Sequence, residues 1–170
     1  MAVPRPTPLR STSIRTLADL LGARAADLPD VSVTGVTLDS RAVVGGDLYA
    51  ALPGARAHGA DFVESAAALG AAAVLTDSDG ASRVSAAGVD LPVLVVDSPR
   101  AVLGEVSAEI YGTTDLTLRM LGITGTNGKT TTAYLVHSAL TALGAATGLI
   151  GTVETRIGDE RLDSVRTTPE

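Results

Sequence analysis

The stretch that decides the fold reads Gly122-Ile123-Thr124-Gly125-Thr126-Asn127-Gly128-Lys129-Thr130-Thr131. An apolar run at residues 116–123 leads into it and predicts a strand, and the apolar spacing after Lys129 predicts a long helix. A glycine-rich turn between a strand and a helix is the setting in which phosphate-binding loops occur. The stretch therefore predicts a nucleotide-binding α/β unit.

Each residue type in this loop has a physical reason to meet phosphate. Glycines let backbone N–H groups turn inward, and the positive end of the following helix dipole points to the same place. Lys129 supplies a charge for the β- and γ-phosphates, and the Thr130 hydroxyl is a ligand for Mg²⁺. The strict G-x4-G-K-[ST] spacing is not met, because Ile123 stands five positions before Gly128. The alternative interpretation is a glycine-rich turn without a ligand.

Upstream of the loop, short apolar runs alternate with helical patterns, which favours an α/β domain. The predicted strands are residues 31–39, 47–52, 72–76 and 93–96, and the predicted helices are residues 61–69, 82–87 and 99–111. A helix is also expected from Ile14 to Leu21, after a proline-rich start. We therefore divide the chain into a lead-in with a short helix (1–25), an α/β domain (26–112) and the start of a second α/β domain (113–170).

Two helices of the first domain have recognisable caps. Asp61 with Glu64 has the form of a capping box. Ser98 followed by Pro99 predicts another helix start, because the missing N–H of proline costs nothing in a first turn. Gly112 is expected to end that second helix.

The second domain is predicted to begin with a βαβ unit over residues 116–150. Its helix is expected to bury Leu135, Val136, Ala139, Leu140 and Leu143. A strand at residues 153–157 and a charged hairpin around Gly158-Asp159 follow. One βαβ unit cannot cover both faces of its own sheet. We therefore expect an incomplete domain.

Composition excludes several functional classes. The net charge of −6 argues against nucleic-acid binding, because phosphate backbones need a basic surface. The absence of cysteine excludes a disulfide framework, a thiolate metal site and a cysteine nucleophile. No signal peptide or membrane span is predicted, and we expect a cytoplasmic protein without a membrane partner.

The run from Thr124 to Thr131 resembles the ATP loop of the Mur ligases and of their folylpolyglutamate synthetase relatives. Members of this family join a carboxylate to an amine at the expense of ATP, through an acyl phosphate. The resemblance implies that Lys129 is catalytic and that Thr130 binds Mg²⁺. It also implies that the residues of the loop bind ATP, namely Gly125, Thr126, Asn127, Gly128, Lys129, Thr130 and Thr131.

The block Thr37-Leu38-Asp39-Ser40-Arg41, followed by Gly46-Asp47-Leu48-Tyr49-Ala50-Ala51-Leu52, is similar to the UDP-substrate domain of Mur ligases. The folylpolyglutamate synthetases lack this block. The resemblance implies a small N-terminal UDP-substrate domain before the ATP domain. It implies contacts to the UDP-sugar from Leu38, Ser40, Ala55, Arg56 and Ala57. Without the resemblance, residues 39–41 are the polar end of a strand.

The tail, Gly148 to Val153 and then Thr167-Thr168-Pro169-Glu170, is similar to the Mur ligases that add the third peptide residue. The resemblance implies that Thr167 and Thr168 contact UDP-MurNAc-L-Ala-D-Glu. It also implies a monomeric enzyme that adds a diamino acid, with meso-diaminopimelate preferred over L-lysine on prevalence alone. The family's carbamylated lysine, its further Mg²⁺ ligands and its amino-acid-binding domain would lie past residue 170.

Alternatives stay open at this point. They are a last-step Mur ligase, a P-loop kinase or NTPase with an unrelated first domain, and a non-catalytic UDP-sugar-binding module. His137 is expected to pack or face solvent, and His58 is evenly balanced between the substrate site and a structural role. Arg41 is expected to pair with Asp39 or Asp47 rather than with phosphate.

Overall fold

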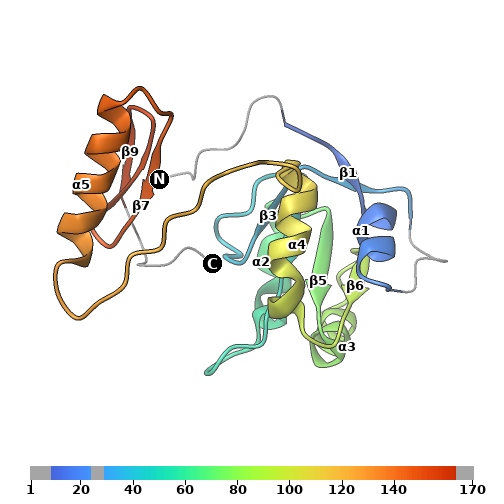
Figure 1. Cartoon of the computed structure of the whole chain (residues 1–170). Helices are drawn as coiled ribbons and strands as arrows, with labels where there is room; N and C mark the ends of the chain where they lie inside the picture. Colours follow the sequence, from blue (N-terminus) through green and yellow to red (C-terminus); the bar gives the residue numbers. More distant parts are fainter. Residues whose placement is uncertain (1–8, 24–28, 164–170) are drawn as a thin grey trace. The chain divides into compact units, whose positions relative to one another are not determined.

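The computed structural model describes residues 9–23 and 29–163. The chain forms two compact units, Met1–Leu116 and Thr117–Glu170. The boundary between them lies four residues after the predicted one at 112/113. Figure 1 shows the helices and strands of both units.

A four-stranded parallel sheet organises the first unit, with strands β3 (Gly35–Thr37), β4 (Asp47–Ala50), β5 (Ala73–Thr76) and β6 (Val93–Val95) in that order. Successive residues of a strand face opposite sides. Leu48 and Ala50 accordingly lie in one apolar cluster, and Tyr49 and Ala51 lie in the other. The sheet is therefore covered on both faces, as the α/β prediction requires.

Helices α1 (Ile14–Leu20) and α4 (Pro99–Tyr111) cover one face. Strand β1 (Thr12–Ser13) pairs antiparallel with β2 (Ser32–Val33) beside them. Ile14 and Leu17 of α1 are fully buried in the same cluster as the sheet. Residues that the sequence division assigned to a lead-in thus form part of this unit's core, because the apolar stripe of α1 packs into the cluster that α4 and the sheet share.

Helices η1 (Gly59–Phe62), α2 (Val63–Ala68) and α3 (Ser78–Ala86) cover the other face. The capping box predicted at Asp61 and Glu64 is wrong. The box instead joins His58 to Asp61, one turn earlier. Helix α3 likewise begins before the predicted position, because the Asp77 side chain accepts from Gly80 N and caps it.

The predicted ends of α4 are confirmed. Pro99 occupies the first turn, and Gly112 closes the helix in the left-handed region with φ of 64°. Ser98 is the N-cap residue as expected, but its side chain makes no capping hydrogen bond with the described residues. The backbone N–H of Val36 in β3 donates to Tyr111 Oη at 3.2 Å, which ties the end of α4 to the sheet.

The second unit contains α5 (Lys129–Ala142) and a three-stranded antiparallel sheet. Its strands are β7 (Gly148–Ile150), β8 (Glu154–Ile157) and β9 (Glu160–Asp163). Gly158, with φ of 57°, turns the β8–β9 hairpin as the sequence predicted.

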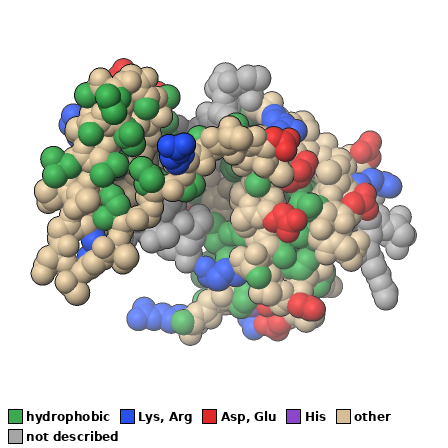
Figure 2. Space-filling view, in the orientation of Figure 1, with side chains coloured by type: hydrophobic (Ala, Val, Ile, Leu, Met, Phe, Trp, Pro, Cys, Tyr) green, Lys and Arg blue, Asp and Glu red, His purple; other side chains and the backbone are tan. Residues whose placement is uncertain are grey.

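Two predictions for this unit are wrong. Residues 116–123 form no strand, because nothing among the described residues pairs with them, so the expected βαβ unit is absent. Helix α5, which lies wholly inside the described range, has no buried side chain. Leu135 is 66% exposed and Leu143 is 82% exposed. Figure 2 shows hydrophobic side chains gathered on the surface of this unit. Within the described ranges, no helix is long and apolar enough to cross a membrane.

Candidate functional site

The predicted phosphate loop leads directly into α5. Two glycines have positive φ, Gly125 at 150° and Gly128 at 76°, and Gly128 is the N-cap of the helix. Such φ values are open to glycine at little cost. They place the backbone N–H groups of the helix start at the loop, and such a start is an anion-binding arrangement when a lysine accompanies it.

Lys129 folds back over this loop. Its ammonium donates to the Gly125 carbonyl and, at 3.4 Å, to the Thr126 carbonyl. The loop residues Gly125, Thr126, Asn127, Gly128, Lys129, Thr130 and Thr131 are all exposed. Neutral carbonyl oxygens therefore hold the Lys129 ammonium at the start of α5. An anion bound there would contact both the backbone N–H groups of the helix start and this ammonium.

A polar cluster anchors α5 to the sheet behind it. Tyr134 Oη donates to Glu154 at 2.7 Å, and Arg156 pairs with the same carboxylate. The Arg156 guanidinium lies 5.2 Å from the centre of the Tyr134 ring. The Tyr134 hydrogen bond, with help from Arg156, lowers the pKa of Glu154, and the carboxylate raises the pKa of Tyr134. These contacts fix the helix that presents the loop.

His137 lies on the half-buried side of α5. Its Nε2 is buried and has no hydrogen-bond partner among the described residues. The packing role expected for His137 stays a prediction.

In the first unit, the segments predicted to meet the UDP-sugar follow β3 and β4, at the carboxyl edge of the parallel sheet. Leu38 packs against the first apolar cluster, and Ser40 is buried. Burial raises the pKa of Tyr49, and a hydrogen bond from Ser40 acts in the opposite direction. Arg41 pairs with Asp39 at 2.9 Å, which confirms the predicted structural pair.

Ala55, Arg56 and Ala57 form the exposed tip of a narrow hairpin after β4. Pro53 and His58 close the hairpin in an antiparallel bridge. A Cβ on Gly54 would lie 2.7 Å from the Ala57 carbonyl, so the turn depends on glycine. Ligands of parallel α/β sheets bind outside the carboxyl ends of the strands, and the hairpin lies at that edge.

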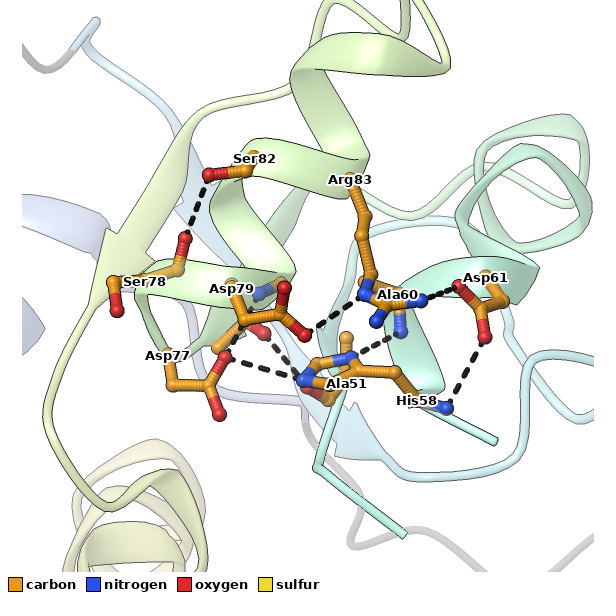
Figure 3. Close-up of polar contacts among 11 residues, drawn as sticks. Ala51, His58, Ala60, Asp61, Asp77, Ser78, Asp79, Ser82 and Arg83 are labelled. Atoms are coloured by element: carbon orange, nitrogen blue, oxygen red, sulfur yellow. Dashed lines mark hydrogen bonds and ion pairs between the residues drawn. The ribbon is translucent and has the colours of Figure 1, made fainter. Parts of the chain in front are cut away.

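A polar network around the buried His58 supports the base of the hairpin (Figure 3). His58 Nδ1 accepts from Ala60 N at 3.0 Å, and His58 Nε2 lies 3.1 Å from Asp77 Oδ1. Asp61 accepts from His58 N at 3.1 Å and from Arg83 at 2.7 Å. Sequence reasoning missed this network, because histidine is not an expected N-cap and Asp77 is far from it along the chain.

Two further site predictions concern the dipeptide and Mg²⁺. Thr167 and Thr168 lie outside the described residues. Among residues 9–23 and 29–163, no three acidic or imidazole side chains cluster as a metal site. Thr130 as a Mg²⁺ ligand therefore stays a prediction.

Comparison with known proteins identifies the class. A model of the Mur ligase family, catalytic domain, matches residues 32–111, and a model of the Mur ligase middle domain matches residues 123–170. The chain belongs to the Mur ligase family.

Two curated relatives are similar to this chain over almost its whole length. UDP-N-acetylmuramoyl-L-alanyl-D-glutamate--2,6-diaminopimelate ligase of Streptomyces coelicolor is 62% identical over 98% of this chain and 32% of the relative. The enzyme of that name from Streptomyces avermitilis is 60% identical over the same shares. The chain therefore spans about a third of the length of these curated relatives.

Two solved structures of Mur ligases have a similar fold. A structure of UDP-N-acetylmuramoyl-L-alanyl-D-glutamate--2,6-diaminopimelate ligase has a TM-score of 0.67 at 25% identity, over 91% of this chain and 30% of that one. A structure of MurF from Acinetobacter baumannii has a TM-score of 0.61 at 26% identity, over 81% and 29%. The fold expected from the resemblance is confirmed.

Proposed function

We propose that the complete protein is an ATP-dependent ligase of peptidoglycan precursor synthesis that joins meso-diaminopimelate to UDP-MurNAc-L-Ala-D-Glu. The observation that carries this proposal is the 62% identity to a ligase of that name over 98% of the chain. Such a span takes in both the phosphate loop and the carboxyl edge of the parallel sheet. L-lysine, the other diamino acid considered, lacks such support from the names of these Streptomyces relatives.

The phosphate loop fits the nucleotide that the family uses. Two glycines of positive φ, the start of α5 and an exposed ammonium are the groups that hold a triphosphate. ATP supplies the phosphoryl group that turns a carboxylate, a poor electrophile, into an acyl phosphate. Lys129 would then stabilise negative charge on the transferring group, and Thr130 would hold Mg²⁺.

The substrate residues of the proposal belong to the first unit and to the tail. Leu38, Ser40 and the hairpin tip at residues 55–57 would hold the uridine diphosphate end. Arg56 makes no ion pair with any residue that the structure describes, so its charge is available to a diphosphate. Thr167 and Thr168 would contact the dipeptide. We further propose a cytoplasmic, monomeric enzyme.

The test is phosphate release by the complete protein with ATP, Mg²⁺ and UDP-MurNAc-L-Ala-D-Glu. We expect release only when meso-diaminopimelate is added, with a matching tripeptide product by mass spectrometry. Activity with L-lysine instead would change the assigned amino acid. Activity only with UDP-MurNAc-tripeptide and D-Ala-D-Ala would favour a last-step ligase, and ATP turnover without any UDP-sugar would favour an unrelated NTPase.

A further inference from the structure

His58 is a buried histidine beside an exposed loop. Its side chain is 6% exposed, whereas residues 54–57 immediately before it are exposed. A buried imidazole with both ring nitrogens engaged cannot also reach a ligand. The contacts of His58 therefore point to an effect on the loop rather than on the reaction.

The two ring nitrogens of His58 have different partners. Nδ1 accepts a hydrogen bond from the backbone N–H of Ala60 at 3.0 Å. Nε2 lies 3.1 Å from Asp77 Oδ1. His58 thus performs the N-cap function that a short polar side chain usually performs.

The network clamps the hairpin base from three elements. Asp61 of η1 accepts from His58 N, and Asp77 at the end of β5 binds the imidazole while it caps α3 through Gly80 N at 2.8 Å. Tyr49 of β4 donates from its buried hydroxyl to the Gly59 carbonyl at 2.7 Å. Asp79 and Arg83 of α3 complete the charged surroundings, with Arg83 paired to Asp61 and Asp79.

The tip that this base presents carries one charged group. Arg56 is exposed and makes no ion pair with the described residues, while the backbone beneath it is held on both sides. A guanidinium on a pre-ordered loop loses less conformational freedom when it binds an anion than one on a loose loop. Rigidity at the base should therefore increase the affinity contributed by Arg56.

We propose that His58 is a positioning residue for the UDP-sugar: as the N-cap of η1 and in contact with Asp77, it holds the 53–58 hairpin so that Arg56 meets the diphosphate. The inference rests on the proposed function, and it concerns the role of His58 that the sequence left open. His58 touches neither the substrate nor the reacting atoms.

The test is a double-mutant cycle in the complete protein, with steady-state KM for UDP-MurNAc-L-Ala-D-Glu, KM for ATP and kcat. We expect Arg56→Ala to raise the UDP-substrate KM about ten-fold, the effect of losing one charge-assisted contact. His58→Ala should raise it about five-fold, with kcat and the ATP KM within about two-fold. In the His58→Ala background, Arg56→Ala should cost only about two-fold more.

Two further variants separate positioning from stability. His58→Asn keeps an N-cap acceptor for Ala60 N and should recover most of the UDP-substrate KM. If His58→Ala does not fold, Asp77→Ala takes its place in the cycle, because it removes the partner of His58 Nε2. Leu17→Ala in α1 is the control for stability, because it removes a fully buried side chain from the apolar cluster on the other face of the sheet. It should lower the melting temperature and leave every KM unchanged.

The outcomes are distinct. Equal costs of Arg56→Ala in both backgrounds, or a UDP-substrate KM that His58→Ala leaves within two-fold, would overturn the positioning role while the ligase assignment stands. A Leu17→Ala variant with the same KM rise as His58→Ala would reduce the effect to stability and also overturn it. A wild-type protein that does not consume the UDP-substrate would overturn the proposed function, and this inference with it.

Discussion

Lys129 shows how one residue can serve both the free loop and the proposed bound state. Its ammonium contacts the carbonyls of Gly125 and Thr126, which are neutral acceptors. Phosphate oxygens are charged acceptors and form stronger hydrogen bonds with an ammonium. Under the proposed function, the lysine would therefore exchange these weak partners for the nucleotide without leaving the loop.

We predict that Lys129→Ala in the complete protein lowers kcat by about 10² to 10³, because it removes a charge that stabilises phosphoryl transfer. Binding of the UDP-substrate should stay within a few-fold, since that substrate is assigned to other residues. Steady-state kinetics and direct UDP-substrate binding measure the two effects. Lys129→Arg retains charge and is the control for electrostatics alone. Retention of more than about a tenth of the activity would contradict the assignment.

Leu38 and Ser40 combine a proposed contact with a structural one. We predict that Ser40→Ala raises the UDP-substrate KM about two- to twelve-fold, the loss of one neutral hydrogen bond, and spares the ATP KM. Leu38→Asp should raise it further, because a charge would replace an apolar contact. Leu38 also packs on the core, so melting curves must accompany the kinetics. Changes confined to ATP kinetics would show that these residues do not bind the sugar nucleotide.

At the scale of elements, α3 depends on the carboxylate at its start. The Gly80 N–H hydrogen bond is the main cause that lowers the pKa of Asp77, and His58 acts in the same direction. The Arg83 hydrogen bond is the main cause for the lowered pKa of Asp61. Both carboxylates belong to the network that joins η1 to α3.

We predict from these shifts that acid weakens the first unit. A carboxylate with a lowered folded-state pKa contributes stability that is full above its ordinary value of 3.8 and is lost as the pH falls through the lower pKa. Asp77→Asn should therefore lower the free energy of unfolding at pH 7, and its difference from wild type should shrink in acid. Urea unfolding across pH measures this, with the exposed Asp90→Asn as control. A constant difference at all pH values would refute the prediction.

Two helical glycines give a matched pair of packing predictions. A Cβ on Gly80 of α3 would lie 1.9 Å from Thr76 Oγ1 and 2.6 Å from the His58 ring, whereas one on Gly104 of α4 would meet nothing within 4 Å. Gly80→Ala should destabilise the protein by about 1–3 kcal/mol through overpacking. Gly104→Ala should stabilise it by roughly 0.5–1 kcal/mol, because alanine favours helix. Thermal and urea unfolding measure both, and equal effects would contradict the described packing.

At the scale of the molecule, the chain spans about a third of the length of its curated relatives. Its two units differ in how much of their apolar surface is buried. The first unit buries two apolar clusters around its sheet. In the second, Leu118 and Met120 are 71% and 82% exposed. A surface of this kind contributes little apolar burial to stability.

We predict that the 170-residue chain, tested alone, does not ligate. The family relatives are about three times as long, so groups that complete catalysis are expected outside this segment. Phosphate release that requires both UDP-MurNAc-L-Ala-D-Glu and a diamino acid, measured on this chain, would overturn the prediction. The complete protein under identical conditions is the positive control.

The sequence by itself determined what depends on local order along the chain. The strand and helix alternation, the Pro99 and Gly112 ends of α4, and the glycine–lysine loop before α5 are all local patterns, and the structure confirms them. The loop motif was also enough to indicate the family. The roles of the individual site residues stay predictions.

Only the tertiary structure decided what depends on partners far apart in sequence. An apolar run at residues 116–123 has the pattern of a strand, but a strand needs neighbours to satisfy its backbone, and none of the described residues supplies them. Helix α1 joins the core because the sheet covers its stripe. His58 contacts Asp77, 19 positions away along the chain, because folding brings the end of β5 to its ring. Hydrogen bonds and burial act through space, and sequence spacing alone does not reveal them.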